Sequence, residues 1–152
     1  MSNIKESIDV DVPVTVAYDQ WTQFATFPKF MEAVQSVEQV TDTRNRWTVE
    51  VGGATRSFVT EIAEQTPDER IAWTTVAGDS GHAGVVTFHK LSDATSRVNL
   101  DMDVDPEGFV EQVGDRLGFI ARRVKGDMQR FKVFIESTEV PTGAWRGTVE
   151  QS

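Results

Sequence analysis

Apolar and polar residues alternate in short runs from the beginning of the chain to about residue 104. In residues 4–12 the isoleucines and valines share one face with Glu6, and polar side chains occupy the other face. A period of two over such a run is typical of a half-buried β-strand. The same pattern predicts strands at residues 4–12, 35–41, 45–51, 54–65, 69–77, 82–91 and 96–104.

Turn-forming residues separate these predicted strands at short intervals. Gly52-Gly53 is the clearest case, because both central residues of a type I′ hairpin turn need a positive φ. Connections this short join antiparallel neighbours, since parallel strands require long crossovers. We therefore expect an antiparallel meander with turns at Asp42–Asn45, Gly52-Gly53, Pro67-Asp68, Gly78–Gly81 and Ser92–Ser96.

Helical spacing replaces the alternation in two regions. Between Pro13 and Phe24 large apolar residues recur every three or four positions, and a further short turn is predicted at residues 27–30. Near the other end, Asp105 and the proline after it form a helix start, and an apolar stripe continues from there to Ile135. At 1.5 Å per residue, about thirty residues give a helix roughly 45 Å long.

Together these elements predict an α+β fold. A curved antiparallel sheet of about seven strands would wrap around the long C-terminal helix, with two short helices after the first strand. Residues 1–138 form this predicted domain, and the polar residues 139–152 are interpreted as a flexible C-terminal tail.

Charge and composition narrow the function classes. The chain has 152 residues, a net charge of −9 and no cysteine. A surface this acidic repels phosphate backbones, so nucleic acid is not an expected partner. The lack of cysteine excludes disulfides and thiolate ligands. With no apolar run long enough for a membrane span and no leader pattern, we expect a soluble, cytoplasmic protein.

Familiar catalytic and metal-binding motifs are missing from the sequence. The two histidines, His82 and His89, fall on one predicted strand at an odd spacing, which puts them on opposite faces. The glycines match neither a phosphate-binding loop nor a dinucleotide pattern, and no Gly-x-Ser-x-Gly elbow is present. We therefore expect neither a bound metal nor a cofactor.

The inward-facing positions of the predicted strands are mostly apolar, as in a packed core or a ligand pocket. Phe27, Phe30 and Met31 lie in or directly after the predicted short helical turn at residues 27–30. Short helices of this kind commonly gate cavities. The candidate ligand-binding residues are Tyr18, Trp21, Phe27, Phe30, Trp47, Arg56, Phe58, Thr60, Trp73, Phe88, Met102 and Leu117.

Arg56 and Glu6 are the candidate catalytic residues, and each has two interpretations. Arg56 would bind a ligand carbonyl or carboxylate if it points inward, or it extends to water beside the hairpin. Glu6 would act as an acid or base if buried, or it pairs with a surface cation. Thr60 either contacts a ligand or is a packed hydroxyl that the backbone satisfies.

Several short motifs over residues 3–137 resemble the START/Bet v1-like (SRPBCC) superfamily, and within it the polyketide cyclase/dehydrase family. The motifs that carry this resemblance are Val12-Pro13 with Trp21, Phe27-Pro28-x-Phe30, Trp47 before Gly52-Gly53, Asp68-Glu69-Arg70-Ile71-Ala72-Trp73, Gly84-Val85-Val86-Thr87-Phe88, Thr95-x-Arg97-Val98 and Arg130-Phe131-Lys132.

The resemblance implies a helix-grip cavity between the sheet and the long helix. Such cavities hold lipophilic or aromatic molecules, and relatives include aromatase/cyclases, ubiquinone-binding proteins and lipid carriers. The first hypothesis is therefore a protein that binds a polyketide-, quinone- or lipid-like molecule. The second is a polyketide cyclase or dehydratase, with an acyl-carrier protein as partner. The third is a protein-interaction module without a ligand, whose tail around Trp145 engages another protein.

Overall fold

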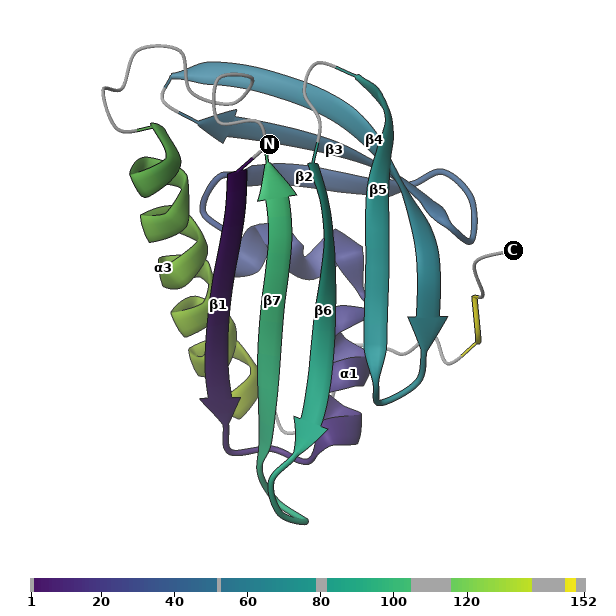
Figure 1. Ribbon diagram of the computed structural model, residues 1–152, viewed down its shortest axis with the longest axis vertical. Coiled ribbons are helices and arrows are strands. Elements are labelled where there is room, and N and C mark those ends of the chain that lie inside the picture. The colour runs from purple at the N-terminus through teal and green to yellow at the C-terminus, as the bar shows by residue number, and fades with distance from the viewer. Residues whose placement is uncertain (1, 52, 79–81, 105–115, 138–146, 150–152) are drawn as a thin grey trace.

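Seven antiparallel strands form one curved sheet in the computed structural model, which describes residues 2–51, 53–78, 82–104, 116–137 and 147–149 (Figure 1). The strand order is β1-β7-β6-β5-β4-β3-β2, so only β1 joins a strand that is distant in sequence. The predicted antiparallel meander is confirmed. The strands are β1 (Ser2–Val10), β2 (Val34–Gln39), β3 (Arg44–Val51), β4 (Ala54–Thr66), β5 (Arg70–Gly78), β6 (His82–Lys90) and β7 (Ser96–Val104).

The sheet curves because its longest strand is irregular. The pairing of β4 with β5 shifts register twice, between Val59 and Thr60 and again between Ile62 and Glu64. Bulges of this kind bend a strand and increase its twist. As a result β2 and β3 run crosswise to β1, β7 and β6, and the sheet becomes a half-barrel (Figure 1).

Helices occupy the concave side of this half-barrel. They are α1 (Val14–Trp21), the 3₁₀-helix η1 (Phe24–Lys29) and α3 (Arg116–Ser137). The α1 helix packs on β6 and β7, and α3 packs on β1. The predicted α+β helix-grip fold is therefore confirmed. The proposed start of the long helix at Asp105 falls on residues 105–115, which lie outside the described residues.

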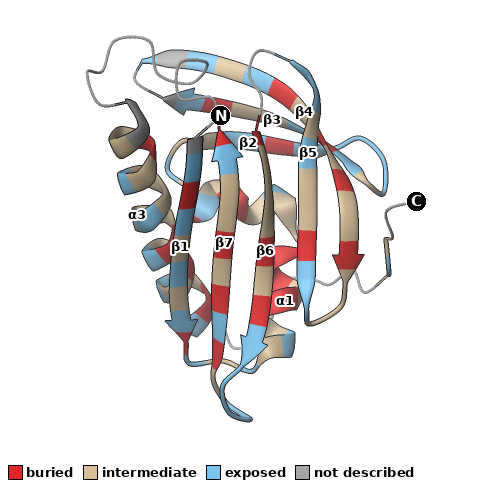
Figure 2. Cartoon of the chain, viewed as in Figure 1, coloured by how far each residue is buried: buried red, intermediate tan, exposed pale blue. Residues whose placement is uncertain are grey.

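An aromatic cluster fills one end of the concave side. The Phe131 ring of α3 makes edge-on contacts with Trp21 at 5.0 Å and with Phe30 at 5.2 Å between ring centroids. Trp21 in turn meets Phe27 at 5.5 Å. These side chains are almost completely buried. Along the strands, buried residues alternate with intermediate and exposed ones, as expected for a sheet with one face against the core (Figure 2).

Part of the predicted tail contacts the domain. Val149 pairs with Gln65 of β4 through two backbone hydrogen bonds of 2.8 Å. The buried Gln65 side chain also donates to the Tyr18 hydroxyl at 2.9 Å. Residues 138–146, which include Trp145, and residues 150–152 lie outside the described part of the chain.

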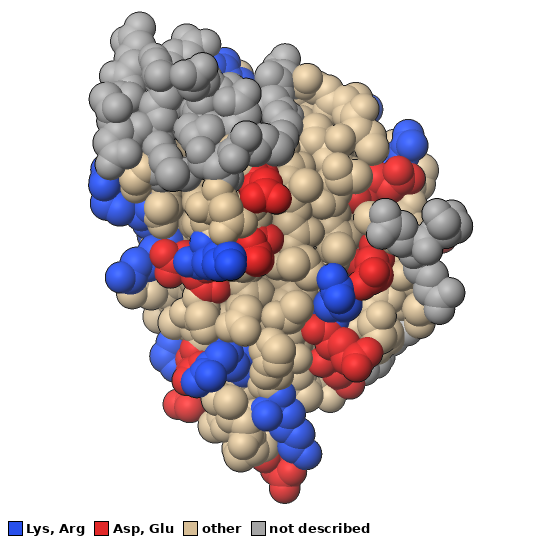
Figure 3. All heavy atoms as spheres, in the orientation of Figure 1, with Lys and Arg blue, Asp and Glu red and all other residues tan. Residues whose placement is uncertain are grey.

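Basic and acidic side chains are interspersed over the outer face of β1, β7, β6 and β5 (Figure 3). Arg97 of β7 pairs with Asp9 of β1 at 2.7 Å, and Arg70 of β5 pairs with Glu64 of β4 at 2.5 Å. Because positive and negative side chains are mixed on this face, it presents no continuous positive potential that would attract a polyanion. Among the described helices, none is long and apolar enough to cross a membrane.

We predict that Phe131→Ala lowers the free energy of unfolding by about 3–5 kcal/mol, because it leaves a cavity among packed aromatic rings. Val133→Ala is the matched control on the same helix, since Val133 is 69% exposed, and its effect should stay within about 0.5 kcal/mol. Urea titration followed by tryptophan fluorescence measures both. Equal effects of the two substitutions would contradict the packing described here.

Candidate functional site

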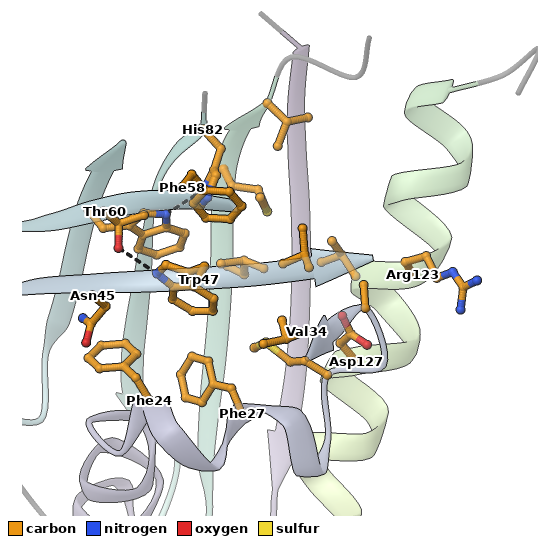
Figure 4. Close-up of a pocket in the computed structure, with 18 of the residues that line it drawn as sticks. Phe24, Phe27, Val34, Asn45, Trp47, Phe58, Thr60, His82, Arg123 and Asp127 are labelled. Carbon is orange, nitrogen blue, oxygen red and sulfur yellow. Dashed lines mark hydrogen bonds between the residues drawn. The ribbon is translucent and has the colours of Figure 1, made fainter. Parts of the chain in front are cut away.

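A cavity of about 170 Å³ lies between the curved sheet, η1 and α3 (Figure 4). It separates the aromatic cluster from a second buried cluster built on Ile4, Val104 and Ile120. Four side chains pack against both clusters and line the cavity between them: Val34, Trp47, Met102 and Val124.

Aromatic rings form much of the wall. Trp47 of β3 stacks on Phe58 of β4, with ring centroids 6.2 Å apart and planes inclined by 17°. On its other side Trp47 meets Phe27 at 5.6 Å and Phe24 at 6.2 Å, both from η1. Flat apolar walls of this kind favour a ligand with aromatic rings. The other apolar lining residues are Met31, Ala33, Val34, Val49, Ile62, Ile71, Leu100, Met102, Val104, Ile120, Val124 and Met128.

Two of the three tryptophans in the wall, Trp47 and Trp73, have hydrogen-bond partners for their indole N–H groups. Trp47 Nε1 donates to Thr60 Oγ1 at 2.8 Å, and Trp73 Nε1 donates to His82 Nδ1 at 2.9 Å. These bonds fix the ring orientations, since a buried donor without a partner is costly. Trp47 and Trp73 therefore present ring faces and edges to the cavity with their polar atoms already satisfied.

His82 is a neutral imidazole in the wall. It is 8% exposed, and its backbone N–H and C=O bond the Thr75 hydroxyl at 3.0 and 2.8 Å. Burial lowers the pKa of His82 from 6.5 to about 4. Because Nδ1 accepts the bond from Trp73, the ring proton resides on Nε2.

Gly84 of β6 makes room for the Trp73 ring. The two residues are cross-strand partners, and a Cβ on Gly84 would lie 2.8 Å from the Trp73 ring and 2.9 Å from the Asp101 carbonyl oxygen. No real Cβ tolerates such distances, so a larger residue would displace the indole. The glycine thus positions the ring that holds His82.

Asn45 of β3 is the polar residue of the lining with the least satisfied side chain. It is 2% exposed, and among the described residues no donor lies within hydrogen-bonding distance of its Oδ1. Its amide lies beside Phe24, at the end of the cavity away from α3 (Figure 4).

A charged cluster closes the opposite side, where residue 32 meets α3. Glu32 pairs with Arg123 at 2.5 Å and with Arg130 at 3.6 Å. Its backbone N–H donates to Asp127 Oδ1 at 3.1 Å, and Arg130 Nε donates to the Phe30 carbonyl at 3.0 Å. Burial raises the pKa of Asp127, while the Arg130 contact and the Glu32 N–H oppose that rise. Arg123 and Asp127 also line the cavity.

The sequence-derived candidates divide into two groups in the structure. Arg56 is half-buried near the start of β4 and Glu6 is half-buried on β1; neither is part of the cavity lining. Tyr18, Phe30 and Phe88 are buried in the aromatic core beside it, and the Leu117 side chain lies outside the described residues. The candidates that do line the cavity are Trp21, Phe27, Trp47, Phe58, Thr60, Trp73 and Met102.

Four polar lining residues were missed: Asn45, His82, Arg123 and Asp127. Asn45 is the last residue of the predicted turn and the first of the predicted strand 45–51; in the structure it belongs to β3 and has the same parity as Trp47 and Val49. This shared parity is the sequence feature that could have identified Asn45 as an inward-facing residue. His89 is exposed on the outer side, as predicted, and the described residues contain no cluster of metal ligands.

We predict that the free energy of unfolding falls by about 3 kcal/mol from His82 alone as the pH drops from 6.5 to 4. The unfolded chain binds a proton at His82 in this window and the folded chain does not, so acid favours unfolding. The control is His82→Asn, whose side-chain oxygen still accepts from Trp73. Its stability should decline less over this range, as measured by urea titration at each pH. Parallel curves for the two proteins would contradict a buried neutral imidazole.

Comparison with known proteins agrees with this fold and cavity. The family model described as polyketide cyclase/dehydrase and lipid transport matches residues 10–133. An uncharacterized 17.2 kDa protein in the melC2-rnhH intergenic region of Streptomyces lincolnensis is 55% identical over 149 residues, covering 98% of this chain and 99% of that protein.

Solved structures share the fold at low sequence identity. The Zhui aromatase/cyclase from Streptomyces sp. R1128 superimposes with a TM-score of 0.74 and 13% identity, over 89% of this chain and 93% of that one. A Deinococcus radiodurans protein gives a TM-score of 0.70 and 24% identity, over 90% and 98%. The chain belongs to the polyketide cyclase/dehydrase and lipid transport family.

Proposed function

We propose that this protein binds one compact aromatic molecule in the cavity between the sheet and α3. The observation that carries the proposal is the wall itself, in which rings and aliphatic side chains line the space and the indole N–H groups of Trp47 and Trp73 are satisfied within the protein. A ligand that covers this apolar surface binds favourably because apolar area is removed from water, and the surface offers it few polar contacts.

The volume limits the size of the ligand. A dry, apolar engineered cavity of about 150 Å³ in another protein binds benzene, and drug-sized ligands occupy pockets of roughly 300–1,000 Å³. At about 170 Å³ this cavity therefore fits a molecule of one or two rings in the conformation described. A longer chain would require η1 or α3 to move.

The same volume favours binding over cyclisation of a poly-β-ketone chain. A cyclase must hold the extended chain in a reactive conformer and move protons at its carbonyl groups. Here the His82 ring is neutral with its Nδ1 committed to Trp73, and Arg56 lies outside the lining. The Zhui structure is named an aromatase/cyclase, and at 13% identity that likeness concerns the fold.

We predict that naphthalene binds with a dissociation constant on the order of 10⁻⁵ M. At ten times that concentration it should raise the melting temperature by about 3–6 °C. Titration followed by tryptophan fluorescence is suitable, because Trp47 and Trp73 line the cavity.

Val49→Phe should abolish this binding by filling the cavity, since Val49 is 6% exposed and part of its lining. The matched control is Val76→Phe on β5, where the same change falls on a residue that is 42% exposed. Binding that survives in Val49→Phe, or that never occurs in the unmodified protein, would refute a cavity ligand.

A further inference from the structure

Two polar side chains face each other across neighbouring strands in the cavity wall. Asn45 of β3 and Thr60 of β4 are direct cross-strand partners, and both line the cavity. Partners on one face of an antiparallel pair have Cβ atoms about 4.5–5.5 Å apart, close enough to contact one ligand atom together. Figure 4 shows both at the same end of the space.

The hydrogen-bonding capacity of this pair is incompletely used. The Asn45 Oδ1 acceptor has no donor among the described residues. Thr60 Oγ1 accepts from Trp47 Nε1, and in the described part of the chain its side chain makes no other hydrogen bond. A hydroxyl can also donate. The wall therefore offers one acceptor, on Asn45, and one donor, on Thr60, to a partner that the protein does not supply.

We infer that the ligand carries a hydroxyl group on its ring system and places it at Asn45. This inference rests on the proposed function and names the ligand class. The ligand hydroxyl donates to Asn45 Oδ1 and accepts from the Thr60 hydroxyl, so that one group satisfies both residues. A phenolic or naphtholic compound meets this requirement, whereas an unsubstituted hydrocarbon or a methyl ether does not.

The charge distribution supports a neutral polar group at this position. Arg123 and Asp127 lie at the other end of the cavity, towards α3 (Figure 4). The end that holds Asn45 is walled by Phe24 and by the Trp47 indole. A carboxylate placed there would lose its hydration without gaining a cation, which is far less favourable than burying a hydrogen-bonded hydroxyl.

Three probes of similar size separate the contributions. Naphthalene has no hydrogen-bonding group, 2-methoxynaphthalene only accepts, and 2-naphthol both donates and accepts. In the unmodified protein we expect 2-naphthol to bind about tenfold tighter than 2-methoxynaphthalene in isothermal titration calorimetry. Equal affinities for these two would overturn the inference while leaving the proposed function intact.

Asn45→Leu tests the residue itself, because leucine has nearly the same size and no polar atom. The preference for 2-naphthol over naphthalene should fall about tenfold in this variant, and its melting temperature without ligand should rise as an unsatisfied amide is removed. Met102→Leu is the control within the lining and should change the affinities for all three probes alike. A structural Asn45 would instead give a lower melting temperature and an unchanged preference.

A second measurement needs no variant. The side-chain amide resonances of Asn45 should shift on adding 2-naphthol and move much less with 2-methoxynaphthalene. Identical shifts with the two probes would overturn the inference even if Asn45→Leu failed to fold. If none of the three probes bound, the proposed function would fail, and the inference that rests on it would fail too.

Discussion

A sheet curved this strongly encloses more space than one helix fills, and the rest of the structure follows from that constraint. The two register shifts in β4 bend the sheet into a half-barrel. The aromatic side chains of α1, η1 and α3 fill one end, and the cluster around Ile120 fills the other. The space left between them is the cavity. Its wall is the boundary shared by two cores, which is why Trp47 and Met102 pack against both.

The polar groups of the wall reveal which positions are structural and which remain available to a ligand. The Trp73 indole is fixed by His82, His82 is fixed through its backbone by Thr75, and Gly84 gives the indole its space. These groups satisfy one another and rigidify the wall. Asn45 is not part of this hydrogen-bond network, and its Oδ1 has no partner among the described residues. An unsatisfied buried amide lowers stability by roughly 1–3 kcal/mol, and proteins retain such groups mainly where function uses them.

Alternation along the sequence predicted the strands and the inward positions of their regular stretches, because the side-chain period of a strand without a bulge is two. It therefore identified Trp47, Phe58 and Thr60 correctly as inward positions. Parity says nothing about location along a curved strand. Arg56 has the same parity as Phe58, but it lies near the start of β4 and is not among the residues that line the cavity. Whether an inward residue meets the cavity or the core depends on helix packing, which the spacing of apolar residues does not determine.

The walls of the cavity differ in how strongly they are held. Among the described residues, much of the wall consists of paired strands and aromatic contacts, whose separation would break hydrogen bonds and expose apolar area. Where Glu32 meets α3, the closing contacts are the partly exposed pairs with Arg123 and Arg130 and a single backbone bond to Asp127. Exposed ion pairs contribute only about 0–1 kcal/mol each, because water replaces them readily. Among the described contacts at this side, the Arg130 bond to the Phe30 carbonyl and the packing of Phe30 on Phe131 therefore contribute more than the ion pairs to holding the end of η1 against α3.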